Sequence, residues 1–180
     1  MRSRFAVVLA LALPLLSACG GGGLGGLIDS ISNGSGSGGN HGAGVGAMSP
    51  AEQADADAVL SLVNVERARA SLPPVVTDVQ ASRAAYDHAV DMDVRQYFDH
   101  NSPAPNSTGP GQRLTTAGAS FSSWGENIAM GQPTPAEVMS AWMNSPGHRA
   151  NILTPGFTHL GVGVRYGTGT VLWVQDFLSK

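Results

Sequence analysis

Residues 160–178 read LGVGVRYGTGTVLWVQDFL, and this stretch decides the fold class. Two apolar runs, 160–166 and 171–178, flank the Gly/Thr sequence at 167–170, a pattern that predicts a β-hairpin. Neither run alternates clearly between apolar and polar residues, so we expect both faces of the sheet to be covered. The covering layers must come from the preceding part of the chain.

Helical segments before the hairpin provide that cover. The first begins after Ser49, a predicted N-cap followed by proline, and ends near residue 70, ahead of two consecutive prolines. A second runs from about residue 77 to 97. A third begins at Thr134 with a T-x-x-E capping box and continues through Trp142, and a short helical turn follows Ser145. Residues 99–123 are predicted to be loop with a short helix. The prediction is an α+β fold, an α–β–α sandwich with an antiparallel sheet between helical layers.

The first 48 residues carry a different signal. Two arginines precede an apolar run at 5–16, which is typical of a secretory signal and too short to span a bilayer. The following Leu-Ser-Ala-Cys resembles the bacterial lipoprotein box. We therefore expect a signal peptide at 1–18, a lipidated Cys19 with a Gly/Ser-rich tether over 19–48, and a globular domain at 49–180. The alternative is an ordinary secreted protein with an unpaired cysteine.

This organisation predicts a location in the cell envelope, with a lipid anchor at Cys19 as the membrane contact. The domain would face the periplasm or the cell exterior. Gly20, not Asp, follows Cys19, which favours the outer over the inner membrane in a Gram-negative cell. A glycine-rich tether of this length reaches roughly 30 Å.

Charge and cysteine content exclude two classes of protein. The net charge is −3, and it becomes −5 when the signal peptide removes two arginines. Because no basic patch with interleaved aromatics is present, nucleic acid is not an expected partner. Cys19 is the only cysteine, so the fold has no disulfide and depends on its hydrophobic core.

One carboxylate stands out in the middle of the chain. Glu126, in SWGENIAMG at 123–131, is the only ionisable residue between Arg113 and Glu137. Its apolar neighbours predict a partly buried segment, and a buried carboxylate needs a partner. Identifying that partner is central to the functional prediction.

Several motifs occur in a fixed order along the globular part. They are VNVERAR at 63–69, YFDH at 97–100, GENIA at 125–129, AWMNSPGHRANIL at 141–153, GVGV at 161–164 and WVQDF at 173–177. Together they resemble the CAP superfamily of cysteine-rich secretory proteins, antigen 5 and pathogenesis-related 1 proteins, in its cysteine-poor bacterial branch. The resemblance covers roughly residues 50 to 180 and implies an α–β–α sandwich.

The resemblance also implies a solvent-open cavity, which in animal members is lined by two His and two Glu. By motif, His100 and His148 match the histidines, and Glu126 matches the glutamate of G-E-N. The place of the second glutamate, three residues after Trp142, is taken by Ser145. This chain therefore carries a triad and lacks the second carboxylate.

A His₂Glu set with an open position is a zinc-site pattern. We therefore expect His100, His148 and Glu126 as metal ligands, and the resemblance implies zinc or magnesium as the ion. The alternative is that these groups only hydrogen-bond one another and brace the loops. Gln175 and Asp176 are further candidates to point toward the cavity. His88 is predicted to be a packing or surface residue, and Arg67 to pair with an acid such as Glu66.

Three functions fit this sequence. The first, which the resemblance implies, is a non-enzymatic binding module for a small apolar ligand, such as a fatty acid or phospholipid, or for an envelope protein. The second is a metal-dependent or serine-type hydrolase acting on peptide or cell-wall substrates, with Ser102 or Ser145 paired to a histidine. The third is a structural envelope protein. Neither H-E-x-x-H nor G-x-S-x-G occurs, which favours the binding module.

Overall fold

The computed structural model describes residues 46–180. Cys19, the predicted signal peptide and most of the predicted tether lie outside these residues. Among the described residues, no helix is both long and apolar enough to span a bilayer. In chain order the elements are α1 (Pro50–Arg69), β1 (Val76–Thr77), α2 (Val79–Arg95), α3 (Pro110–Thr116), β2 (Ser123–Met130), α4 (Pro135–Asn144), α5 (Pro146–Ile152), β3 (His159–Tyr166) and β4 (Val171–Ser179).

The four strands form one sheet in the order β1-β3-β4-β2. Strands β3, β4 and β2 are antiparallel, as predicted, and β3 and β4 form the predicted hairpin. The sheet as a whole is mixed, because the two-residue strand β1 runs parallel to β3. The expectation of a purely antiparallel sheet is therefore wrong at this edge. Strand β2, which forms the opposite edge, was not predicted.

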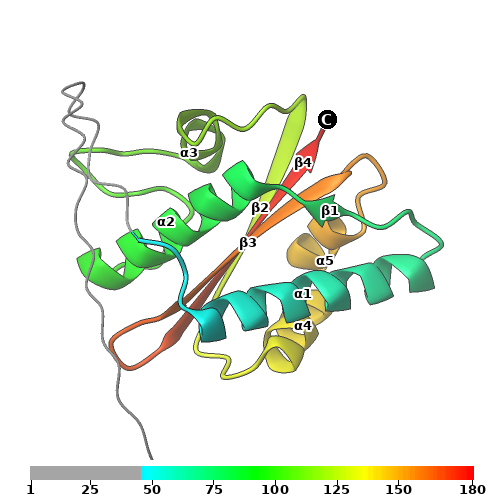
Figure 1. The fold of residues 1–180 in the computed structure, drawn as a ribbon, viewed down its shortest axis with the longest axis horizontal. Helices are drawn as coiled ribbons and strands as arrows, with labels where there is room; N and C mark the ends of the chain where they lie inside the picture. The colour runs from blue at the N-terminus through cyan, green and yellow to red at the C-terminus, as the bar shows by residue number, and fades with distance from the viewer. Residues whose placement is uncertain (1–45) are drawn as a thin grey trace, which may run out of the picture. The chain divides into compact units, whose positions relative to one another are not determined.

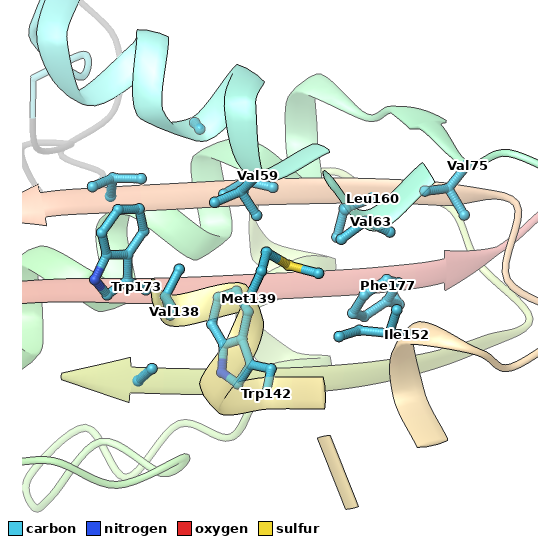
Figure 2. Packing of buried hydrophobic residues seen from close by; sticks show 14 of the residues in the cluster. Val59, Val63, Val75, Val138, Met139, Trp142, Ile152, Leu160, Trp173 and Phe177 are labelled. Carbon is cyan, nitrogen blue, oxygen red and sulfur yellow. The ribbon is translucent and has the colours of Figure 1, made fainter. Parts of the chain in front are cut away.

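Helices cover both faces of the sheet, which confirms the α–β–α sandwich (Figure 1). Helices α1, α4 and α5 lie on one face, and α2 and α3 lie on the other. Alternate residues of β4 supply the two layers of core. Trp173 and Phe177 pack with Val59, Val63 and Trp142 on the first face (Figure 2). On the second face, Leu172 and Val174 pack against α2, and Leu178 packs in a cluster with residues of α2 and α3.

Two glycines of β3 set the position of α2. A Cβ atom at Gly161 would lie 2.1 Å from the backbone carbon of Ala81, and one at Gly163 would lie 2.3 Å from the backbone nitrogen of Tyr86. Both contacts are too close for any side chain. The GVGV motif therefore lets the helix backbone rest directly on the strand.

The predicted helix starts are confirmed, with two differences in detail. Ser49 caps α1 in a complete capping box with Glu52. At α4, the Glu137 backbone N–H donates to Thr134 Oγ1, but the Glu137 carboxylate accepts from the Thr134 hydroxyl and not from its backbone. Only half of the predicted box is therefore formed. Ser145 is the N-cap residue of α5, but its side chain makes no capping bond.

Arg67 differs from its prediction. It was expected to pair with an acid, yet its side chain is fully buried and, within the described residues, donates only to main-chain carbonyls. Its guanidinium reaches the carbonyl oxygens of Pro73, Ile152, Thr154 and Phe157, each at 2.9 Å. Arg67 thus ties α1 to the loop before β1 and to the segment before β3.

Candidate functional site around Glu126

Glu126 lies on the edge strand β2, and its side chain is only 1% exposed. One carboxylate oxygen, Oε1, accepts a hydrogen bond from His100 Nδ1 at 2.7 Å. The other, Oε2, accepts from Arg113 Nη2 at 2.5 Å. The buried carboxylate therefore has the partner that its sequence context required, and both of its oxygens are occupied.

Arg113 is a site residue that was not predicted from the sequence. It lies on α3, and its Nη1 donates to the main-chain oxygens of His100 and Thr108, each at 2.9 Å. The guanidinium therefore holds both Glu126 and the loop that carries His100. A sequence signal existed, because Arg113 is the last cation before Glu126 in an otherwise uncharged stretch.

His100 presents its imidazole at the surface of this cluster. Its side chain is 48% exposed, and the hydrogen bond to Glu126 raises its pKa above the usual histidine value. Since Nδ1–H donates to the carboxylate, the opposite ring nitrogen, Nε2, is the one left for a ligand. Glu126 thus fixes both the tautomer and the orientation of this ring.

Asp176 is the second carboxyl group of the cluster. It lies opposite Glu126 in the β2–β4 register, is completely buried, and neither of its oxygens has a hydrogen-bond donor among residues 46–180. Burial, and then the charge of Glu126, raise its pKa well above the usual range, against the opposing effect of Arg113. A protonated Asp176 can donate to Glu126, so the carboxyl pair carries one negative charge. The expected position of Asp176 near the site is consistent with this geometry.

A chain of buried amides lies on the other face of β2. Asn127 Nδ2 donates to the His148 main-chain oxygen at 3.1 Å and to Gln175 Oε1 at 3.0 Å. Asn151 Nδ2 donates to Asn127 Oδ1 at 2.8 Å and to the Glu126 main-chain oxygen at 3.1 Å. Gln175, which was predicted to face the same cavity as Asp176, belongs instead to this network because successive strand residues alternate between faces.

His148 lies in the first turn of α5 and is half-buried. Its pKa is lowered by burial and then by the charge of His100. Within the described part of the chain, its ring makes no hydrogen bond to Glu126 or His100. The structure therefore joins His100 to Glu126 directly and places His148 within electrostatic range. Ser145 is half-buried at the junction of α4 and α5.

Comparison with known proteins identifies the fold family. Residues 60–177 match the family described as CAP, the cysteine-rich secretory protein family. This chain belongs to the CAP family. The resemblance inferred from its motifs is thereby confirmed.

Two curated relatives are proteins of Bacillus subtilis (strain 168). YkwD is 46% identical over 122 residues, which cover 68% of this chain and 46% of the relative. The membrane protein YlbC is 36% identical over 122 residues, covering 68% and 34% of the two chains. The chain thus matches less than half the length of either relative.

Solved structures support the same CAP fold. An extracellular SCP-domain protein from Bacillus anthracis str. Ames has a TM-score of 0.67 and 33% identity, covering 76% of this chain and 45% of that one. An outer surface protein from Borrelia burgdorferi has a TM-score of 0.65 and 22% identity, covering 71% and 94%. The second comparison bears on the fold alone.

The expected three-ligand metal site is not assembled in the described part of this CAP domain. Between residues 46 and 180, no group of three or more His, Cys, Asp or Glu side chains is arranged to hold an ion. Glu126 is poorly suited as a direct ligand, because its buried carboxylate already pairs with the Arg113 cation and accepts from His100. It fits instead as a carboxylate behind a ligating histidine, a common arrangement in metal sites. Binding of an ion by His100 and His148 stays a prediction.

The serine-type version of the hydrolase prediction finds no histidine partner in this CAP domain. Ser102 is buried and accepts a hydrogen bond from the Tyr97 hydroxyl at 3.1 Å. Neither Ser102 nor Ser145 is hydrogen-bonded to a histidine side chain in the part of the chain that the structure describes. His88 is a buried packing residue whose Nε2 donates to the Asp99 main-chain oxygen at 3.1 Å.

Two cavities of ligand size lie on opposite faces of the sheet. One, of about 380 Å³, lies between α2 and α3 and includes Arg113 in its wall. The other, of about 320 Å³, is a groove between α1 and α4. The groove is lined by Leu62, Glu66, Ala136, Met139, Ser140, Met143 and Asn144. Neither is lined by His100, Glu126 or His148, so these cavities differ from the one implied by the resemblance.

Proposed function

We propose that this CAP-domain protein is a non-enzymatic binding module of the cell envelope, in which His100 and His148 hold a divalent ion and a separate groove between α1 and α4 holds a small apolar ligand. The observation that carries the proposal is the state of Glu126, whose two oxygens are both engaged and whose side chain is buried. Such a carboxylate orients His100 but is not free to act as a base or nucleophile. The imidazoles are therefore the groups available to bind.

A divalent ion is one ligand that suits two imidazoles. His100 Nε2 and His148 would hold it, with Glu126 behind His100 as the orienting carboxylate. Imidazole favours zinc over magnesium, which prefers oxygen ligands. The ion would link the loop that carries His100 to α5. The nearby Arg113 cation opposes tight binding.

The groove between α1 and α4 supports the proposal that the protein binds a small apolar ligand. Its volume of about 320 Å³ lies at the lower end of the range for small-molecule sites. Leu62, Met139 and Met143 supply apolar wall, and methionine adapts readily to irregular apolar ligands. A fatty acid or phospholipid chain fits this chemistry.

An envelope location is supported by two relatives and by the sequence. The Bacillus anthracis protein is extracellular, and YlbC is a membrane protein. The secretory pattern ending at Cys19 supports lipid anchoring of this chain, with the outer membrane favoured in a Gram-negative cell. An envelope protein is an alternative binding partner.

Extraction from membranes tests the apolar-ligand proposal. We expect mass spectrometry of organic extracts to find fatty acid or phospholipid with the wild type and much less with Ser140→Trp, which fills the groove. Glu137→Trp, an exposed position on the same helix outside the groove, is the matched control. An absence of lipid from the wild type, or equal lipid in all three proteins, would remove this ligand from the proposal.

Acid–base hydrolysis is a second candidate, favoured by one observation. The pKa of His100 is raised while that of His148 is lowered, and such opposite shifts are typical of an acid–base pair. The test is prolonged incubation of the metal-free protein with peptides and with peptidoglycan, because histidines that bind zinc could not act as an acid–base pair. Cleavage that is lost in His148→Gln would support the hydrolase, and unaltered substrates would reject it.

A further inference from the structure

Glu126 and Asn127 are consecutive residues that point to opposite faces of β2. Glu126 holds the ring of His100 on the α2 side of the sheet. Asn127 bonds to the His148 main chain on the α5 side. Two consecutive residues of β2 therefore contact the two segments that carry the histidines. His100 is held through its side chain, whereas His148 is held through its backbone.

The side chain of Asn127 is fully buried, and each of its polar atoms is hydrogen-bonded. Both amide protons are donated, one to His148 O and one to Gln175 Oε1, and Oδ1 accepts from Asn151. A buried amide with every donor and acceptor satisfied has one geometry, because any rotation leaves polar groups unpaired. Asn127 is thus a rigid point on the sheet.

Helix α5 depends on such external contacts for its orientation. It has seven residues, about two turns, and Ser145 provides no side-chain cap at its start. Strand β2 is hydrogen-bonded to α5 near both ends of the helix. In the first turn, His148 O accepts from Asn127. Near the last turn, Asn151 donates to Asn127 Oδ1 and to Glu126 O. Without Asn127, the turn that carries His148 would lose its hydrogen bond to the sheet.

We infer that Asn127 is a positioning residue for His148: it fixes the first turn of α5 against β2, and so sets the distance from His148 to His100. The ligand that depends on this spacing is the divalent ion of the proposed function, on which this part of the inference rests. Asn127 itself does not touch that ligand. Its effect on binding acts only through the position of His148.

Gln175→Met is the matched control for Asn127→Leu in the full chain. Both changes remove a fully buried amide from the same network, but among residues 46–180 the Gln175 side chain bonds only to Asn127 and the Met139 sulfur, not to α5. We expect both variants to lose stability. Only Asn127→Leu should change the residual dipolar couplings of α5 amides relative to the sheet. It should also weaken zinc binding by roughly tenfold or more, as for other groups that orient a ligating histidine.

Asn127→Asp provides a second variant of the same size should the leucine variant fail to fold. It keeps the acceptor for Asn151 but presents an oxygen to the His148 carbonyl, and we expect the same displacement of α5. An unmoved α5 in both variants, or an equal displacement in Gln175→Met, would overturn the inference. If the wild type binds no zinc, the metal proposal fails, while the α5 couplings still decide whether Asn127 positions His148.

Discussion

Glu126 and Asp176 face each other across β2 and β4, and the fully buried Asp176 receives no hydrogen bond from the described residues. Arg113 and His100 bond only to Glu126 within this pair. The negative charge therefore resides on Glu126, and Asp176 is kept neutral by burial and by the charge of its neighbour. The edge of the sheet thus carries a buried carboxyl pair behind an exposed imidazole.

Replacing Asp176 by asparagine should stabilise the protein at neutral pH. In the wild type, the raised pKa of Asp176 stabilises the fold below the unfolded value of 3.8, and this stabilisation is lost as pH rises toward the folded pKa. The asparagine variant keeps a donor toward Glu126 without that loss. We expect a gain of about 1–3 kcal/mol in the free energy of unfolding at pH 7, measured by urea denaturation. A destabilised variant would contradict a neutral Asp176.

Replacing Glu126 by glutamine should destabilise the protein strongly. The change leaves the Arg113 guanidinium, which is only 10% exposed, without a counter-charge. Breaking a buried ion pair in this way typically costs about 3–5 kcal/mol. Glu66→Gln, which breaks the exposed pair with Arg69, should cost at most about 1 kcal/mol. Equal losses in the two variants by chemical denaturation would show that Glu126 is not a buried ion-pair partner.

The buried, neutral His88 should cause the protein to lose stability as the pH falls into the mildly acidic range. Burial lowers its pKa to about 4, whereas the unfolded value is 6.5. The unfolded state therefore binds the proton first, and the contribution of His88 is lost as pH falls from 6.5 to 4. The loss is on the order of 3 kcal/mol. An NMR titration of the His88 ring should have its midpoint near pH 4, and a midpoint near 6.5 would contradict its burial.

Replacing Gly163 by alanine should force α2 away from the sheet. The added Cβ would lie 2.3 Å from the Tyr86 backbone nitrogen, and neither backbone can yield without loss of packing. We expect a loss of about 3 kcal/mol or more, read as a fall in Tm. Gly147→Ala is the control, since a Cβ atom at Gly147 would have no described neighbour within 4 Å and alanine favours helix. A tolerated Gly163→Ala would contradict the α2–β3 contact.

Local signals predicted the parts of this fold that depend on neighbouring residues. Ser49 predicted the start of α1 because a capping box needs only four consecutive positions. β2 was missed because Gly125, Glu126 and Asn127 interrupt its apolar pattern. Each of these residues has a role in the site. Glu126 bonds to His100, and Asn127 bonds to α5. Gly125 leaves room for Asn151, because a Cβ atom at Gly125 would lie 3.0 Å from Asn151 Oδ1.

The contacts of the site residues with partners distant in the sequence were the part that could not be predicted. The isolation of Glu126 in an uncharged stretch indicated a buried carboxylate in need of a partner, and family motifs pointed to His100. The roles of Arg113 and Arg67 did not follow from the sequence. In the sequence, a buried arginine cannot be distinguished from a surface arginine, because the fold alone brings together the guanidinium and the carbonyls or carboxylate that it contacts.

Zinc titration of the full chain by calorimetry tests the proposed binding site most directly, with a His100→Ala/His148→Ala double variant checked for folding beside it. We predict one ion per chain for the wild type and none for the double variant. Absence of binding by the wild type, or equal binding by the variant, would contradict a site formed by His100 and His148.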